Sequence, residues 1–356
     1  MHRTHLACAL ALAAAPALAL AQPSSLTIYG IADAGVRHTS GLTAANAASD
    51  GSTNGVASGV NSTSRLGFRG REDLGEGLFA LFNLETGLNL DTGTTANATK
   101  FFDRAATVGL GGRWGQVTAG RQTNLLADAI SPVDAVGMRF AAFNPNIATA
   151  ALSSHGLGGE YGTAGANTGS YRLDNALKYT GRFGPVTARA MYSFGENAGG
   201  ASRQSSAGLG AAVAAAGWTV SGAYQRFKSA ADLELDAATL GAAYQWGSVR
   251  LALNTARSDA DTSATARTVQ RVHSAGATWA ATSAVDLTAA FYRVERQRTA
   301  RRDDAYNRAM LFAEDKLSPR SRLYLEVDRT HWSGNYQGSA NKDKATGITA
   351  GVVHHF

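Results

Sequence analysis

Apolar and polar residues alternate along most of this chain. In the stretch 64–71, the apolar residues Leu66 and Phe68 share one parity and three arginines share the other. Those arginines are Arg65, Arg69 and Arg71. Similar alternation recurs in residues 26–37, 78–89, 218–225, 249–254 and 322–328. Because a β-strand places successive side chains on opposite faces, the pattern predicts an all-β protein whose strands have one apolar and one polar face.

Seven short turns separate these segments. They lie near residues 75, 113, 183, 216, 247, 282 and 318. Most are about 35 residues apart, a spacing that fits two strands and one longer loop. The longer connections are polar and rich in small residues: 39–64, 91–100, 195–204, 257–268, 298–306 and 333–346. Short turns at one rim and long polar loops at the other are typical of a transmembrane, antiparallel, up-and-down β-barrel.

The interval from residue 113 to residue 183 is about twice the usual spacing. Within it, residues 125–169 contain Pro132 and Pro145 and show no sustained alternation, so we expect one long inserted loop. Seven turns then join fourteen strands, and one strand at each end gives sixteen. A further hairpin inside the interval would give eighteen strands, which is the alternative.

The composition of the two strand faces indicates which solvent each one meets. The apolar parity is rich in Ala and Gly, whereas the core of a soluble β-sandwich needs large aliphatic residues. Aromatic residues lie towards the segment ends, at Tyr179, Trp218, Tyr224, Trp246, Trp279, Trp332 and Phe356. Such a face is typical of a lipid-exposed band with aromatic girdles. Charged residues on the other face would each cost several kcal/mol in a dry interior, so we expect a water-filled lumen.

The N-terminus predicts export. Residues 1–21 contain Arg3, an apolar run and small residues before a cleavage site, as in a secretory signal peptide. Residues 22–356 then form one barrel domain, and a barrel with such a leader indicates the outer membrane of a Gram-negative cell. The single cysteine, Cys8, is removed with the leader, so we expect neither disulfides nor a thiolate metal site. We expect no cofactor and no metal and, despite a net charge of +6, no nucleic-acid partner.

Several motifs together resemble the general porins of Gram-negative outer membranes, in their β-proteobacterial form. They are LTIYGIADAGV, SRLGFRGREDLGEGLFALFNLE, FFDRAATVGLGGRWGQVTAGRQ, YRLDNALKYT and the terminal HHF, in the order of the family and over nearly the whole mature chain. The resemblance implies a barrel of sixteen strands, usually a homotrimer, whose third long loop folds into the lumen. It also implies passive diffusion of small hydrophilic solutes and ions, without catalysis. Outer-membrane lipid and lipopolysaccharide are the other expected partners.

The resemblance also identifies a candidate pore constriction, where cations on the inner wall face acidic residues on the inserted loop. The wall cations that match the motifs are Arg65, Arg104 and Arg172, joined through shared parity by Arg69 and Lys178. The candidate anions of the loop are Asp128, Asp134 and Glu160. We expect Asp134 to form the centre of an acidic patch. Because cations outnumber anions, we expect a mild preference for anions.

Two other functions are compatible with the sequence. A substrate-specific channel for sugar or phosphate would carry an aromatic ladder or a denser cluster of Lys and Arg along the lumen. A barrel-based outer-membrane enzyme would need an activated nucleophile beside a histidine and an acid. The sequence shows no clear ladder, and the histidines of the mature chain have no convincing partner motif.

Overall fold

Strands make up nearly all the regular structure of this chain. The computed structural model describes residues 25–140, 144–150, 171–195 and 203–356. The predicted signal peptide and Glu160 lie outside these ranges. Among the described residues, no helix combines the length and the apolar character needed to cross a membrane.

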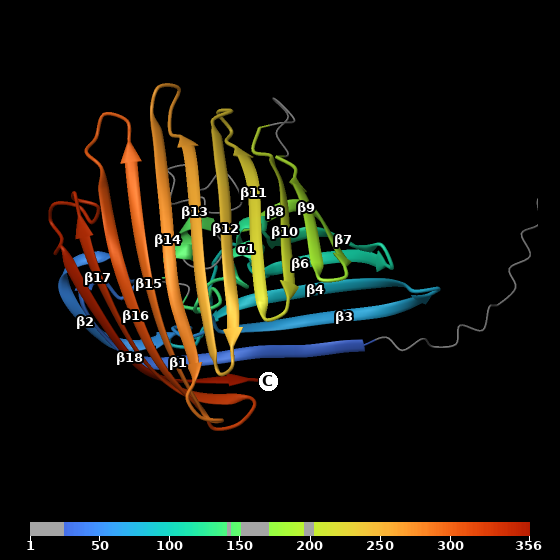
Figure 1. The fold of residues 1–356 in the computed structure, drawn as a ribbon, viewed down its shortest axis with the longest axis horizontal. Helices are drawn as coiled ribbons and strands as arrows, with labels where there is room; N and C mark the ends of the chain where they lie inside the picture. The colour runs from blue at the N-terminus through green and yellow to red at the C-terminus, as the bar shows by residue number, and fades with distance from the viewer. Residues whose placement is uncertain (1–24, 141–143, 151–170, 196–202) are drawn as a thin grey trace, which may run out of the picture.

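The strands form one antiparallel sheet that closes on itself (Figure 1). In chain order they are β1 (Ser25–Leu42), β2 (Ala48–Ser58), β3 (Arg65–Gly75), β4 (Leu78–Asn89), β5 (Thr94–Thr95), β6 (Ala105–Gly112), β7 (Gly115–Thr123), β8 (Arg172–Phe183), β9 (Val186–Ser193), β10 (Ser206–Ala215), β11 (Trp218–Lys228), β12 (Glu234–Trp246), β13 (Val249–Asp261), β14 (Arg267–Ala280), β15 (Val285–Arg298), β16 (Asp304–Lys316), β17 (Ser321–Ser333) and β18 (Lys344–His355). Two short helices, α1 (Leu125–Ile130) and α2 (Pro145–Ala150), lie between β7 and β8.

These segments occupy sixteen positions in the barrel wall. β2 and β3 share one position, because β3 pairs with the first half of β1 and β2 with the second half. β5 is a two-residue addition to the end of β4. β1 also pairs with β18, from Ile31 opposite His355 to Ser40 opposite Thr346, which closes the sheet. The prediction of sixteen strands is confirmed, and the alternative of eighteen is wrong because β7 pairs directly with β8.

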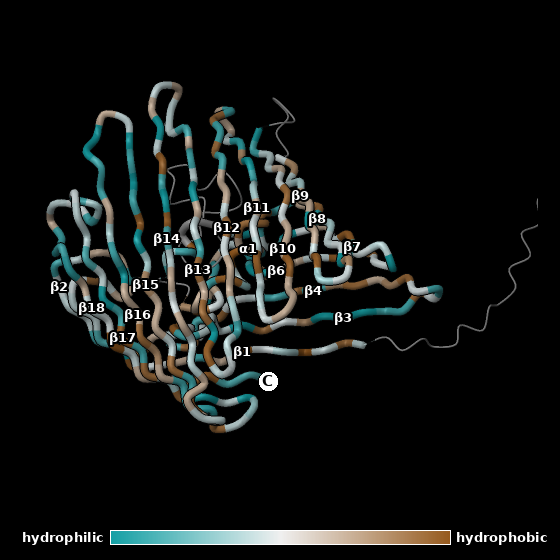
Figure 2. Tube along the Cα trace, viewed as in Figure 1, coloured by the Kyte–Doolittle hydropathy of each residue, from teal (hydrophilic) through white to brown (hydrophobic). Residues whose placement is uncertain are grey.

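The predicted short turns all join neighbouring strands. They connect β3–β4, β6–β7, β8–β9, β10–β11, β12–β13, β14–β15 and β16–β17. The connections at the opposite rim are longer and largely hydrophilic (Figure 2). Two of them were predicted too long: residues 48–58 form β2, and the loop expected at 257–268 shrinks to residues 262–266. Polar residues are compatible with strands that extend beyond the apolar band, so composition alone misplaces these loop boundaries.

The two faces of the wall differ as the alternation predicts. Large apolar side chains on the outside are exposed, among them Leu26, Ile28, Val108, Leu110, Leu240, Leu253, Phe291, Leu325 and Val352. The alternate, inward positions hold polar and charged residues such as Asp33, Arg37, Glu85, Lys178, Asn254, Glu314 and Glu326. A broad apolar outer surface of this kind is stable against hydrocarbon rather than water. Closure of the sheet satisfies the backbone groups that lipid cannot.

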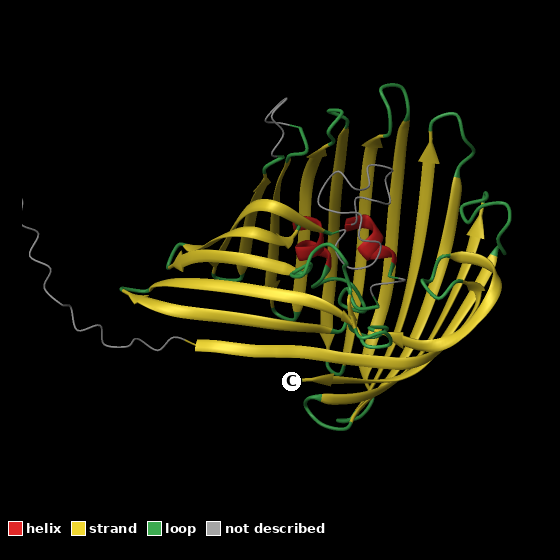
Figure 3. Ribbon diagram, turned by 180° about the vertical axis from the view of Figure 1, so that it is seen from behind, coloured by secondary structure: helices red, strands yellow, loops and turns green. Residues whose placement is uncertain are grey.

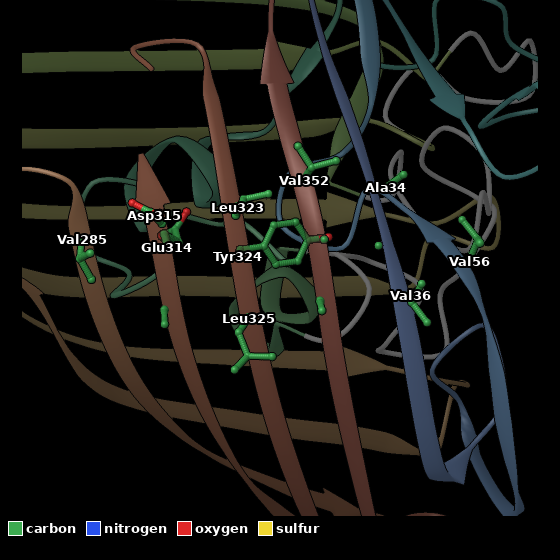
Figure 4. A pocket seen from close by; sticks show the side chains of 14 residues that line it. Ala34, Val36, Val56, Val285, Glu314, Asp315, Leu323, Tyr324, Leu325 and Val352 are labelled. Atoms are coloured by element: carbon green, nitrogen blue, oxygen red, sulfur yellow. The ribbon is translucent and has the colours of Figure 1, made fainter. Parts of the chain in front are cut away.

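Side chains inside the barrel fasten the seam between the first and last strands. The ring of Tyr324 on β17 lies across β18 (Figure 4), and its hydroxyl donates to Asp33 of β1 at 2.8 Å. A Cβ at Gly351 of β18 would lie 2.4 Å from the Tyr324 ring, so this crossing requires glycine. Arg37 of β1 makes a second crossing and donates to Glu326 of β17 at 2.8 Å. Both contacts bridge strands that are not themselves paired.

The segment between β7 and β8 lies inside the barrel where it is described (Figure 3). α1 contacts β9, β10, β11 and β12, and α2 contacts β13 and β14. The expected loop 125–169 corresponds to the interval between the end of β7 at Thr123 and the start of β8 at Arg172. Residues 141–143 and 151–170 of this interval lie outside the described ranges.

Candidate functional site

α1 directs the inserted segment along the inner wall. Asn124 caps this helix, and its side-chain oxygen accepts from the N–H of Ala127 at 2.9 Å. The N–H of Leu125 donates to Gln225 Oε1 of β11, also at 2.9 Å. Leu125 packs in a buried apolar cluster with Phe227 of β11. This six-residue helix thus attaches the segment to strands that are distant from β7 in sequence.

Asp134 anchors the next part of the segment. Its side chain is fully buried. The carboxylate accepts from the backbone N–H of Met138 (2.8 Å), the amides of Asn144 (3.0 Å) and Asn146 (2.8 Å), and the Tyr292 hydroxyl of β15 (3.0 Å). Four donors stabilise a buried carboxylate that water cannot reach. Asp134 therefore fastens the segment to β15, and its side chain is buried rather than exposed at the surface of the lumen, where we expected an acidic patch.

Two arginines, one on the barrel wall and one on the inserted segment, hold the segment against the wall. Arg250 of β13 donates to the carbonyl oxygens of Pro132 (2.6 Å) and Asp134 (3.3 Å). Arg139 of the segment forms an ion pair with Glu314 of β16, with 2.7 Å between Nη1 and Oε1. These contacts satisfy carbonyl groups and a buried carboxylate that have no partner in strand pairing. Arg250 of β13 and Glu314 of β16 therefore have structural roles.

Glycines on the wall leave room for the segment. A Cβ at Gly241 of β12 would lie 2.5 Å from the side chain of Val133, and a Cβ at Gly276 of β14 would lie 2.4 Å from that of Ala135. Packed side chains do not approach so closely without displacement. The inner face of β12 and β14 is thus shaped to receive residues 133–135.

The three predicted wall arginines come together around Glu85 of β4. Arg104 Nε donates to Glu85 Oε1 at 2.6 Å, and Nη1 of Arg65 lies 3.9 Å from the same oxygen. Arg172 Nε donates to the carbonyl oxygen of Arg104 at 2.6 Å, and its guanidinium lies over the ring of Tyr171. Arg104 and Arg172 are almost fully buried, whereas 22 % of the Arg65 side chain is exposed. Three guanidinium groups around one carboxylate give this cluster a net positive charge.

Two further arginines, Arg69 and Arg71, continue the inward parity of β3. Both are exposed. The guanidinium carbon of Arg69 lies 5.0 Å from the centre of the Tyr29 ring, and that of Arg71 lies 3.5 Å from the centre of the Phe79 ring. Within the described ranges, no carboxylate forms an ion pair with either arginine. Because a cation–π contact holds a side chain without neutralising it, both arginines leave positive charge in the lumen.

Lys178 of β8 and Asp128 of α1 are in direct contact. Lys178 Nζ lies 2.7 Å from Asp128 Oδ2, and it also donates to Thr123 Oγ1 at 3.1 Å. Arg189 of β9 approaches the same carboxylate, with 4.0 Å between Nε and Oδ2. The predicted wall cation and loop anion thus neutralise each other and do not face each other across an aqueous gap.

The structure therefore separates the predicted site into three groups. Arg65, Arg104 and Arg172 form one cluster with Arg69 beside it on β3, Lys178 and Asp128 form an ion pair, and Asp134 lies in a buried network. Sequence reasoning missed Glu85, Arg250 and Glu314 as partners. Each of them has inward parity on its strand, but parity does not identify which side chain a residue will meet. 

The chemistry of this site is electrostatic. In the part of the chain that the structure describes, no group of three His, Cys, Asp or Glu side chains is arranged to hold a metal ion. Unpaired cations along a wet wall attract anions and orient dipolar solutes without binding them tightly.

Comparison with known proteins agrees with this architecture. The sequence pattern of the family described as Gram-negative porin matches residues 7–335. An outer membrane porin protein of Bordetella pertussis is 38 % identical over 140 residues, which are 37 % of this chain and 36 % of that protein. Outer membrane porin protein 32 of Delftia acidovorans is 36 % identical over 196 residues, which are 53 % of this chain and 49 % of that protein. The aligned part thus spans less than half the length of these two relatives.

Solved structures extend the likeness over the whole barrel. An anion-selective porin from Comamonas acidovorans superimposes with a TM-score of 0.77 at 25 % identity, covering 94 % of this chain and 100 % of that one. A loop-deletion form of OmpT, an outer membrane protein of Vibrio cholerae, superimposes with a TM-score of 0.70 at 16 % identity, covering 94 % and 99 %. The OmpT likeness supports the fold alone. With a family match over most of its length and a closed barrel of sixteen strands, this chain belongs to the Gram-negative porin family and is an outer-membrane protein.

Proposed function

We propose that this protein is a channel through which small hydrophilic solutes and ions cross the outer membrane by passive diffusion, with a mild preference for anions. The observation that carries the proposal is the charge of Arg69 and Arg71 on the inner face of β3, which no described carboxylate neutralises. The cluster around Glu85 lies next to them on the same wall and adds to this charge.

Two of the three loop residues predicted to oppose this charge, Asp128 and Asp134, are described, and their contacts support a preference for anions. Asp128 is paired with Lys178, and the carboxylate of Asp134 is buried among four donors. Neither places a free negative charge opposite β3. The similar porin from Comamonas acidovorans is anion-selective, which agrees with this proposal.

The preference is expected to be mild because the lumen is aqueous. Two unit charges 4 Å apart interact by about 4 kcal/mol at an effective dielectric constant near 20, and the energy falls towards thermal energy over longer distances. Salt screens it further. Arginines along a wide passage therefore favour the passage of anions without binding them tightly.

We assign different roles to the residues of the proposed constriction. Arg65 and Arg69 supply charge to the passage. Arg104 and Arg172 are buried and support the inner wall through their contacts with Glu85 and with the backbone. The pair of Lys178 and Asp128, and separately Asp134, hold the described part of the inserted segment, residues 125–140 and 144–150, against the inner wall.

The proposed assembly is a homotrimer in which each chain forms its own channel. OmpT of Vibrio cholerae has been solved in a trimer form. In this chain, the outer surface over β1, β17 and β18 forms a shallow apolar concavity lined in part by Val36, Leu325 and Val352 (Figure 4). Apolar surface next to the seam is suited to contact with a neighbouring barrel, and conductance steps in groups of three would show such an assembly.

We propose no catalytic function. Ser321 Oγ and His354 Nδ1 lie 2.9 Å apart on the outer face, a first requirement for a serine nucleophile. A hydrolase also needs a group that orients the histidine. No carboxylate contacts His354 in the described part of the chain.

The first prediction tests the proposed selectivity. We expect the parent channel in a planar bilayer to show, across a salt gradient, a reversal potential with the sign of anion preference. Replacing Arg65, Arg69 and Arg71 together by glutamine should abolish or invert this sign, because three positive charges leave the inner wall.

The matched control is Arg226→Gln on the outer face of β11. This arginine is paired with Asp236, with 2.7 Å between Nε and Oδ1, and lies outside the lumen. Its removal should leave the reversal potential unchanged. A parent protein that conducts cations preferentially, or that does not conduct, would contradict the proposal.

A further inference from the structure

Tyr171 is the last residue before β8 and lies in a turn, outside the membrane-spanning strands. The N–H of Asn124 donates to its carbonyl oxygen at 2.9 Å, and only 8 % of the residue is exposed. The guanidinium carbon of Arg172 lies 4.3 Å from the centre of its ring. Because the phenol of a tyrosine is also a weak acid, the groups around it determine whether it ionises.

Three guanidinium groups act on the Tyr171 phenol. Arg172 forms a hydrogen bond with it, and the charges of Arg104 and Arg65 also lie close enough to interact with it. Nη1 of Arg104 is buried, and within the described ranges it has no hydrogen-bond partner. A negative charge on the phenol oxygen would therefore be stabilised by cations and by hydrogen-bond donors.

The described carboxylates near this tyrosine do not cancel the three positive charges. Glu85 pairs with Arg104, with 2.6 Å between Oε1 and Nε, and Asp103 accepts from the N–H of Gly87 at 2.7 Å. The other charged groups on the adjoining elements are bound in ion pairs: Asp174 with Arg121 and Lys100, and Asp128 with Lys178 and Arg189. Three arginines against Glu85 and Asp103 leave one positive charge among the described residues of the cluster, which one phenolate would cancel.

These contacts bring the ionisation of Tyr171 closer to neutral pH. Burial alone would raise the pKa of its hydroxyl above the ordinary value of 10.0. The charges of Arg172 and Arg104, the hydrogen bond from Arg172 and the charge of Arg65 together outweigh burial and lower that pKa to about 8. The hydroxyl is therefore neutral below this pH and negatively charged above it.

We propose that Tyr171 is a specificity-determining residue whose ionisation reduces the anion preference of the channel in mildly alkaline solution. The phenolate cancels the remaining charge of the arginine cluster, and the cluster acts on passing ions through Arg65, which is 22 % exposed. Because Arg69 and Arg71 keep their charge, the preference decreases without reversing. The inference rests on the proposed anion preference and adds to it a dependence on pH.

Tyr179 of β8 offers a matched control. Its hydroxyl donates to the carbonyl oxygen of Trp114 at 2.6 Å, and its ring is stacked with the Trp114 ring at a centroid distance of 6.3 Å. Its parity is opposite to that of the inward Lys178, so Tyr179 lies on the outer face of the barrel. Loss of its hydroxyl should therefore leave the charge of the lumen unchanged.

The second prediction concerns the reversal potential of the refolded full chain in a planar bilayer, across a fixed salt gradient. The pH is varied between about 6.5 and about 9.5, below the ordinary pKa values of tyrosine and lysine. The anion-to-cation permeability ratio of the parent should fall by up to about twofold, because one charge in a wet lumen acts with roughly thermal energy. The midpoint should lie near pH 8. Tyr171→Phe should remove this step, and Tyr179→Phe should keep it.

An absorbance titration of the same proteins detects tyrosinate directly. In the parent, a transition equivalent to one of the 11 tyrosines should occur near pH 8. Tyr171→Phe should lack this transition. Arg172→Gln should move it upwards, towards the ordinary value of 10.0, because it removes the charge that most stabilises the phenolate.

The outcomes separate this inference from the proposed function. A parent that prefers anions equally at every pH, or a Tyr171→Phe variant that keeps the step, would overturn the role of Tyr171 alone. Absence of a tyrosinate transition near pH 8 would also overturn it. A parent with no anion preference at any pH would overturn the proposed selectivity and this role with it. Other groups that titrate in the same range, such as the terminal amine, are present in both proteins and cancel in the comparison.

Discussion

Arg250 and Arg69 show how the same residue type at the same inward parity can serve two purposes. Arg250 on β13 donates to two backbone carbonyl oxygens of the inserted loop and is partly buried against that loop. Arg69 on β3 lies over the ring of Tyr29 and has no described carboxylate partner. The first arginine holds the loop, whereas in the proposed function the second attracts anions into the lumen. 

The difference depends on what lies opposite each strand. β13 faces the inserted loop, whose carbonyl groups need donors once they leave water. On β3, the described contacts of Arg69 and Arg71 are with the aromatic rings of Tyr29 and Phe79, which leave the charge intact. The inner wall of the barrel therefore has a loop-bearing half at β13 and a charge-bearing half at β3, and three sets of variants test this division.

The largest effect is expected from Asp134→Ala on the loop-bearing half. This change leaves the Tyr292 hydroxyl and the amides of Asn144 and Asn146 without their acceptor, at about 1–3 kcal/mol for each orphaned group. The loop should detach while strand pairing keeps the barrel closed. Single-channel recording should show higher conductance and greater current noise.

A conservative variant sharpens this third prediction. Asp134→Asn keeps the size of the side chain and one acceptor oxygen, so its conductance should lie between those of the parent and Asp134→Ala. Unchanged conductance and noise in Asp134→Ala would show that other contacts suffice to hold the loop.

The fourth prediction compares Arg250→Met with Arg69→Met, which remove one inward cation each. Arg250→Met should increase current noise and change the reversal potential less than Arg69→Met does, because Arg250 is partly buried against the loop whereas Arg69 is exposed. Arg69→Met should move the reversal potential towards cation preference without added noise. If both variants changed noise and reversal potential alike, the division of the wall into two halves would be wrong.

The smallest effect is expected for the pair of Lys178 and Asp128. Replacing both, by methionine and leucine, removes one charge of each sign, so the reversal potential should stay near that of the parent. Lys178→Met alone should shift it towards cations, because the Asp128 carboxylate loses its nearest partner. A larger shift in the double variant than in the single variant would contradict the neutral-pair interpretation.

The alternation of apolar and polar residues, and the turns that interrupt it, made much of the barrel predictable. The alternation in residues 26–37 and 322–328 correctly identifies β1 and β17, and all seven short turns lie where Gly-rich and polar breaks interrupt that alternation. The sequence was less informative at residues 48–58, because a strand outside the apolar band has two polar faces. The candidate site was predictable in residue type and parity but not in pairing, as Lys178 and Asp128 illustrate.

The sequence by itself determined the strands, their two faces, the number of barrel positions and the inward direction of Arg65 and Arg69. These properties follow from a period of two residues and from turn chemistry, which are local. Only the tertiary structure decided that Asp134 is buried, that Arg104 binds Glu85, and that Arg69 and Arg71 lie over aromatic rings. Those outcomes depend on where the inserted loop lies inside the closed barrel, and closure brings together side chains that no local pattern relates.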